Sequence, residues 1–164
     1  MDSRHLPLLQ KMISYYSGDP RRVQHFLKVY EFSSLLGQME KLSDDEQFIL
    51  ETAALVHDIG IKKSEEKYGS SAGKYQEIEG PAICEEFLTE LGYGAACIQR
   101  ISYLVAHHHT YQNIDGNDYQ LLVEADFLVN AWEDTLSAQA IASFQEKVFR
   151  SASGKNLLQT IYSR

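Results

Sequence analysis

Apolar residues recur three and four positions apart through most of the 164-residue chain, and this spacing is the feature that most constrains its fold. Such spacing places apolar side chains on one face of an α-helix, whereas a half-buried strand requires strict alternation. No segment shows that alternation, and only three prolines interrupt the chain. No repeat or linker divides the sequence. The pattern predicts an all-α, single-domain bundle of about six to eight helices.

Residues at the ends of the apolar stripes predict where helices begin and end. Asp19 followed by Pro20 is typical of an N-cap and a first helical position. Ser43 and Glu46 have the spacing of a capping box. Gly37 is expected to end a helix, and residues 60–76 are expected to form an irregular or briefly helical connection. The predicted helices span about residues 6–16, 21–36, 44–56, 80–91, 95–109, 119–132 and 138–149, followed by a tail that docks on them.

One predicted helix ends in an adjacent histidine and carboxylate, His57 and Asp58, followed closely by Gly60. An ionised carboxylate buried without a partner costs several kcal/mol or takes up a proton. A divalent metal ion would satisfy both side chains. We therefore interpret His57 and Asp58 as two metal ligands and expect the remaining ligands far away in the sequence.

Other polar side chains lie on apolar helix faces. His25 precedes an apolar residue by one turn, and Asp126 lies within the stripe of a later predicted helix. The triplet His107-His108-His109 ends another stripe, whose spacing carries His108 onto the buried side. Taken singly, each has an ordinary explanation, such as a hydrogen-bonded core histidine or a buried carboxylate with a partner. Their order along the chain is the stronger signal.

Four motifs follow one another on separate predicted helices: Val23-Gln24-His25, Ala54-Leu55-Val56-His57-Asp58-Ile59-Gly60, Leu104-Val105-Ala106-His107-His108-His109 and Val123-Glu124-Ala125-Asp126. Over roughly residues 20–135, this arrangement resembles the HD-domain superfamily of metal-dependent phosphohydrolases. The resemblance implies one helical domain of the HD type over residues 1–164, with a C-terminal helix and tail, 138–164, packed on it. It also implies a shared metal site made of His25, His57, Asp58 and Asp126.

The ligand types indicate the chemistry of such a site. Imidazole and carboxylate ligands suit Mn, Fe, Co, Ni or Zn, and the absence of thiolate ligands argues against a structural zinc site. A metal activates water as a nucleophile and polarises a phosphoryl oxygen. This chemistry fits the activity that the resemblance implies, which is hydrolysis of a phosphate ester or anhydride in a nucleotide or similar small phosphorylated metabolite. One ion is expected, and a second is possible.

Roles can be assigned to individual side chains within this hypothesis. We expect Asp58 to hold the attacking water, and His108, followed by His109, to protonate the leaving group. His107 is a candidate for phosphate binding. The alternative for the triplet is that one histidine faces the site while the other two are solvated neighbours.

The sequence departs from the pattern of its relatives at two positions. Binuclear members place a further histidine between the His-Asp pair and the later histidines, and this chain has none there. Glu79 is a candidate replacement, as a ligand or as an acid or base, although an exposed glutamate in a first helical turn is the alternative. Many relatives carry lysine four places after the motif histidine, but here Lys62 lies one place later. Further candidates for phosphate binding are Arg21 and Arg22.

The formal net charge of −8 argues against general nucleic-acid binding, because the phosphate backbone attracts clustered Lys and Arg. No apolar run approaches the roughly 18 residues that a membrane span needs, and the N-terminal residues lack the apolar core of a signal peptide. We expect a cytoplasmic protein, monomeric or homodimeric. Cys84 and Cys97 lie in separate apolar segments and are interpreted as reduced packing residues.

Two alternative functions remain open at this stage. A minority branch of the superfamily uses a di-iron site to activate oxygen, and the missing middle histidine counts against it. The chain could also be a non-catalytic metal- or nucleotide-binding regulatory module that keeps the ligands for structure.

Overall fold

Three helices form the centre of the molecule: α2 (Pro20–Met39), α3 (Asp44–Val56) and α7 (Asn117–Glu133). The structure, a computed structural model, describes residues 2–162, and all of its regular elements within those residues are helical. The other elements are η1 (Ser3–His5), α1 (Leu6–Tyr15), α4 (Ile61–Tyr68), α5 (Gly73–Glu90), α6 (Ala95–Val105), α8 (Ala138–Val148) and α9 (Ala152–Tyr162). The prediction of an all-α fold is confirmed.

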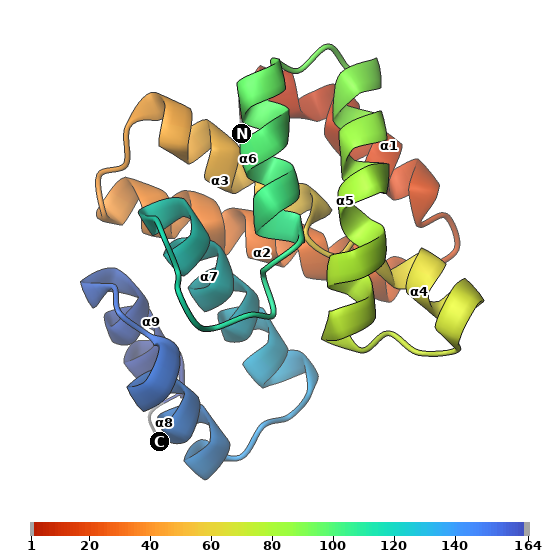
Figure 1. The fold of residues 1–164 in the computed structure, drawn as a ribbon. Coiled ribbons are helices and arrows are strands. Elements are labelled where there is room, and N and C mark those ends of the chain that lie inside the picture. The colour runs from red at the N-terminus through yellow and green to blue at the C-terminus, as the bar shows by residue number, and fades with distance from the viewer. Residues whose placement is uncertain (1, 163–164) are drawn as a thin grey trace.

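The outer helices pack on two sides of this centre (Figure 1). Helix α2 packs on both α3 and α7, and α3 also contacts α6 and α1. Helix α5 packs on α6 and α4, and α9 packs on α7 and α8. The polar side chains described below therefore come from the central helices and from the turns at their ends. Among residues 2–162, none of the helices combines the length and the apolar character needed to cross a membrane.

The predicted helix starts are confirmed by their capping hydrogen bonds. The side chain of Asp19 accepts a hydrogen bond from the backbone N–H of Arg22, and Pro20 is the first residue of α2. Both halves of the capping box between Ser43 and Glu46 are present at the start of α3. These signals are local in sequence, so they determine the helix start without reference to tertiary contacts.

The end of α2 differs from the prediction. Gly37 lies inside the helix, where an added Cβ would collide with the side-chain amide of Gln47 on α3. The helix instead ends after Met39 through Lys41, whose φ is 59°, and a hydrogen bond from Leu42 N–H to Gly37 C=O closes the turn. Gly37 is thus needed for close packing of α2 on α3 rather than for helix termination.

The connection after the His-Asp pair is also more ordered than expected. It contains α4, which ends at Gly69 in the left-handed conformation with a φ of 64°. Helix α5 begins at Gly73 rather than near Gly80, and Pro81 lies within it. An added Cβ on Gly80 would lie 2.7 Å from the side chain of Val105, so this glycine lets α5 approach α6.

The last described helix, α9, packs on α7 and α8. Leu158 is buried, and the hydroxyl of Tyr162 donates a 2.6 Å hydrogen bond to the carbonyl of Leu128 on α7. Cys84 is buried and Cys97 is partly buried, and the two side chains are not joined in the described chain.

Candidate metal centre

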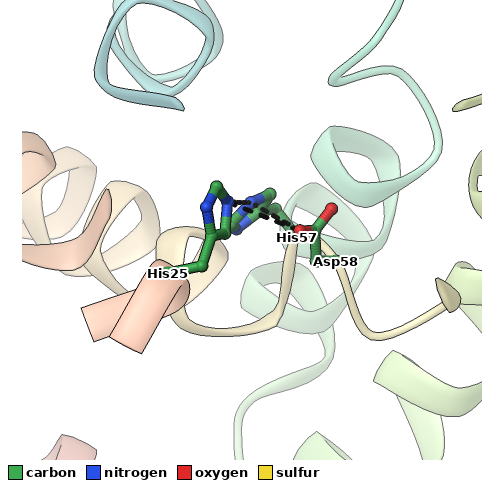
Figure 2. Close-up of side chains that lie close together, drawn as sticks. All are labelled: His25, His57 and Asp58. Atoms are coloured by element: carbon green, nitrogen blue, oxygen red, sulfur yellow. Dashed lines mark hydrogen bonds and ion pairs between the residues drawn. The ribbon is translucent and has the colours of Figure 1, made fainter. Parts of the chain in front are cut away.

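Four side chains from three parts of the fold meet at one buried point. His25 comes from the first half of α2, Asp126 from α7, and His57 and Asp58 from the turn that follows α3. Figure 2 shows His25, His57 and Asp58 pointing toward one another. The Nε2 atom of His25 lies 3.2 Å from His57 Nε2, 3.2 Å from Asp126 Oδ1 and 3.4 Å from Asp58 Oδ2. His57 Nε2 lies 3.5 Å from the same oxygen atoms of Asp58 and Asp126.

These donor atoms fit a shared transition-metal ion. Nitrogen and oxygen ligands about 2.0–2.2 Å from one ion lie roughly 2.8–3.6 Å from each other. The separations of 3.2–3.5 Å fall in that range. Asp126 Oδ1 is buried and has no well-directed hydrogen bond within the described part of the chain. A buried carboxylate oxygen without such a partner is expected where a cation binds.

The buried carboxylates of the cluster stay ionised and favour a positive charge beside them. Burial acts to raise the pKa of Asp58 and of Asp126, but the neighbouring histidines outweigh it and hold both carboxyl pKa values below their usual range. Burial likewise opposes protonation of His25, yet Asp126, Asp58 and Glu133 raise its pKa to about 9. Two carboxylates that stay ionised in a buried site attract a cation, whether protons on the imidazoles or a metal ion.

Backbone carbonyls fix the orientation of two imidazole rings. His57 Nδ1 donates to the carbonyl of Ala54, and His108 Nδ1 donates to the carbonyl of Val105, each at 2.9 Å. A carbonyl only accepts, so each Nδ1 carries a proton, and in the neutral ring Nε2 presents its lone pair to the site.

A second group of donors adjoins the first through Asp58. Its Oδ1 atom lies 3.5 Å from His108 Nε2, and one ligand atom from each of Asp58, His108 and His109 falls within a 4.8 Å cluster. The Nε2 atoms of His108 and His109 have no hydrogen-bond partner among residues 2–162. Gly73 makes room for His109, because a Cβ there would lie 2.6 Å from the imidazole. Asp58 therefore faces both groups of donors.

The first cluster opens into a cavity of about 500 Å³. Arg21 and Arg22 line this cavity, and an aromatic group formed by Tyr111, Phe127 and Phe144 contributes another part of its lining. The rings of Phe127 and Phe144 stack with their centroids 3.7 Å apart, and Tyr111 meets Phe144 edge-on. The cavity thus combines a polar cluster, guanidinium groups and apolar aromatic surface. Of the predicted site residues, those lining it are Arg21, Arg22, His25, Asp58, His109 and Asp126.

Three predicted site residues lie away from both the cavity and the donor clusters. Glu79 forms a 2.7 Å ion pair with Lys67, because α5 begins early enough to place this glutamate against α4. His107 turns away, with Nδ1 donating to the carbonyl of Tyr103 at 2.7 Å. Lys62 is exposed, and its Nζ lies over a tyrosine ring rather than in the cavity. Their assignment as site residues remains a prediction from the sequence, and these contacts do not support it.

Two residues at the site were missed from the sequence. Glu133 Oε2 lies 2.9 Å from His25 Nδ1. Glu133 follows Asp126 by seven residues, or two helical turns, so the sequence does place both carboxylates on one face of the helix. Gln76 is buried and lines the cavity, and its Oε1 lacks a hydrogen-bond partner within the described residues. It belongs to the part of α5 that the sequence did not predict to be helical.

Comparisons with known proteins identify the family and the fold of the chain. A family model described as the HD domain matches residues 22–142. Among solved structures, the chain is similar to a predicted HD superfamily hydrolase from an uncultured Thermotogales bacterium, with a TM-score of 0.69 and 22% identity. The alignment covers 97% of this chain and 86% of the other, and at this identity the likeness concerns the fold. No curated protein matches the sequence.

Proposed function

Because the chain belongs to the HD-domain superfamily, we propose that it is a metal-dependent hydrolase of phosphate esters or anhydrides in small phosphorylated compounds. The observation that carries the proposal is the convergence of two imidazoles and two carboxylates beside a cavity lined by arginines. Phosphoryl transfer needs positioning and charge stabilisation, and these groups supply both.

The residues that would hold a divalent transition metal are His25, His57, Asp58 and Asp126. When bound, such an ion supplies a Lewis acid and lowers the pKa of a coordinated water toward neutrality. His108 and His109, with Asp58, offer donors for a second ion.

The side chains next to the cluster orient the reactants. Asp58 presents its second oxygen toward His108, where it can accept a hydrogen bond from the attacking water. Burial lowers the pKa of His109 to about 4, so its imidazole is neutral near pH 7. A neutral imidazole is suited to ligation or to hydrogen bonding with a phosphoryl oxygen, and it carries no spare proton for a leaving group.

The two arginines are held differently. Arg22 is paired with Asp19 and lies 2.6 Å from Glu65, so its guanidinium is already engaged. The side chain of Arg21 is 74% exposed and makes one long contact of 3.4 Å with Asp134. Because Arg21 can turn toward the cavity at little cost, we assign it the main contact with the substrate phosphate.

The aromatic group of Tyr111, Phe127 and Phe144 supports a nucleotide as substrate, because planar rings pack favourably against aromatic side chains. The phosphate would lie toward Asp58 and Arg21, with the base toward this group.

The test is metal analysis of the purified protein, followed by phosphate release from phosphomonoesters, cyclic nucleotides, dinucleoside polyphosphates and guanosine tetraphosphate. We expect metal-dependent turnover that Asp58→Asn reduces at least about 100-fold. The matched control is Glu86→Gln, which neutralises an exposed carboxylate on α5 and should leave turnover unchanged. Absence of any turnover by the metal-replete protein, or equal turnover in Asp58→Asn, would contradict the proposal. Oxygen uptake by the iron-loaded protein without phosphate release would favour the oxygenase alternative.

A further inference from the structure

We propose that Glu133 is a positioning residue that holds His25 in the orientation required of a metal ligand, and that Lys28 holds Glu133 in place. The inference rests on the metal centre of the proposed function. It concerns residues that touch neither the substrate nor the ion.

The imidazole of His25 is held between two carboxylates of α7. Its Nε2 lies 3.2 Å from Asp126 Oδ1, and its Nδ1 lies 2.9 Å from Glu133 Oε2. Asp126 and Glu133 are separated by two helical turns and therefore lie on the same face of α7. An ionised carboxylate only accepts hydrogen bonds, so Nδ1 of His25 carries the proton. When the ring is neutral, as ligation of a metal ion requires, the lone pair of Nε2 is directed toward the cluster.

Lys28 completes the arrangement from the α2 side. It lies one turn after His25, and its Nζ donates a 2.5 Å hydrogen bond to Glu133 Oε1. The side chain of Glu133 is only 12% exposed, so its charge requires compensation. With both oxygens engaged, Glu133 cannot rotate into the cluster and compete as a ligand.

The position of His25 in its helix explains why it needs this support. His57 follows the end of α3 and His108 follows the end of α6, where terminal carbonyls are free to accept from Nδ1. His25 lies in the first half of the long helix α2, where the carbonyls are used by helical hydrogen bonds. An acceptor for its Nδ1–H therefore has to come from another helix, and Glu133 supplies it.

This arrangement has a measurable consequence. A carboxylate behind a ligating imidazole fixes the ring and increases its basicity, and its loss typically lowers metal affinity 10–100-fold. Glu133→Gln keeps the size of the side chain and removes the charge. We therefore expect Co²⁺ to bind the full-length variant 10–100-fold more weakly than it binds the wild type, with an altered visible absorption spectrum of the bound Co²⁺.

The experiment is a Co²⁺ titration in competition with a chelator, with circular dichroism to check folding of each variant. Asp134→Asn is the matched control, because it removes the same charge from the neighbouring residue, which lines the same cavity but contacts no histidine in the described chain. We expect its affinity to stay within threefold of wild type. Lys28→Met, which leaves the bond between Glu133 and His25 intact, should lose less affinity than Glu133→Gln. Glu133→Asp, which keeps the charge with a shorter reach, should lie between the wild type and Glu133→Gln.

The inference is overturned if Glu133→Gln binds Co²⁺ within threefold of wild type, or if Asp134→Asn loses as much affinity. It is also overturned if Lys28→Met weakens binding as much as Glu133→Gln, because the pair would then be a structural link between α2 and α7. A wild-type protein that binds no Co²⁺ would instead refute the proposed metal centre, and the inference with it. If Glu133→Gln fails to fold, Glu133→Asp decides: wild-type affinity together with an unchanged Co²⁺ spectrum refutes the inference.

Discussion

Gly60, two residues after Asp58, makes the closest backbone approach beside the metal cluster. A Cβ added there would lie 2.6 Å from the carbonyl oxygen of Gln76 and 2.9 Å from the amide nitrogen of Gly80. Both neighbours are backbone atoms of α5, so no side chain can rotate away. Gly60→Ala is therefore predicted to push α5 away from the His-Asp turn.

The size of the effect follows from the contact distances. Reaching the ordinary contact distance of 3.4 Å requires a movement of about 0.8 Å. Overpacking of this kind costs about 2–3 kcal/mol when the surroundings cannot relax. The φ of Gly60 is −73°, which alanine adopts easily, so the smaller entropy of the unfolded chain returns about 0.4–1 kcal/mol. The net loss of folding free energy is about 1–2.6 kcal/mol, or roughly 2–10 °C in Tm.

Urea denaturation of the metal-free protein measures this loss, and Co²⁺ titration measures displacement of Asp58. A shift of about 0.8 Å exceeds the roughly 0.5 Å tolerance of a preorganised site, so metal affinity should fall as well. Gly94→Ala is the control, because its Cβ would meet nothing within 4 Å and its φ is −68°. Its stability should stay within about 0.5 kcal/mol of wild type. A Gly60→Ala protein as stable as Gly94→Ala, with unchanged metal affinity, would refute the steric argument.

Two further predictions concern buried ionisable side chains away from the cluster. Glu124 accepts hydrogen bonds from the backbone N–H groups of Arg150 and Ser151, so Glu124→Ala should cost about 3 kcal/mol and increase hydrogen exchange in α9; unchanged exchange would contradict this. Burial lowers the pKa of His5 below 6.5, although Glu51 opposes it. The unfolded chain then binds this proton at higher pH than the folded chain, so below pH 6.5 the His5 contribution reduces stability by up to about 1.4 kcal/mol per pH unit. His5→Gln should reduce this loss between pH 7.5 and 5.5 in urea titrations, and equal losses in both proteins would show the assignment to be wrong.

The features that could be predicted from the sequence are those with local causes. The apolar stripes and the caps at Asp19 and Ser43 depend on neighbours within one or two turns, and the structure has them where expected. The glycines were harder to interpret. Glycine is common at helix ends, so the sequence favoured a helix boundary at Gly37 and at Gly80. Each of these glycines instead lies within a helix, where its missing side chain lets another helix approach closely. That reason depends on tertiary packing and leaves no local pattern.

The candidate site also contains side chains that the sequence could place and side chains whose position depends on tertiary packing. The order of the motifs suggested that His25, His57, Asp58 and Asp126 belong together, and the structure brings these four side chains to one point. Glu79 instead pairs with Lys67 on α4 and lies away from these four side chains. The contact between these helices depends on where α5 begins, and Pro81 obscured that start. A proline at this position is tolerated because it interrupts only one turn of a long helix.

Phe144, which lines the cavity, belongs to a different segment of the chain from the donor atoms of the cluster. The donor atoms of the cluster are contributed by residues between 25 and 126, whereas this aromatic side chain of the cavity comes from α8, which follows them in the chain. Helix α8 packs on α9, and its Phe144 stacks on Phe127 of α7. A chimaera that exchanges only residues 138–148 would therefore alter the shape offered to a ligand while every donor atom stays in place. Under the proposed function, affinity for the ion and preference for a ligand would thus depend on different segments of the chain.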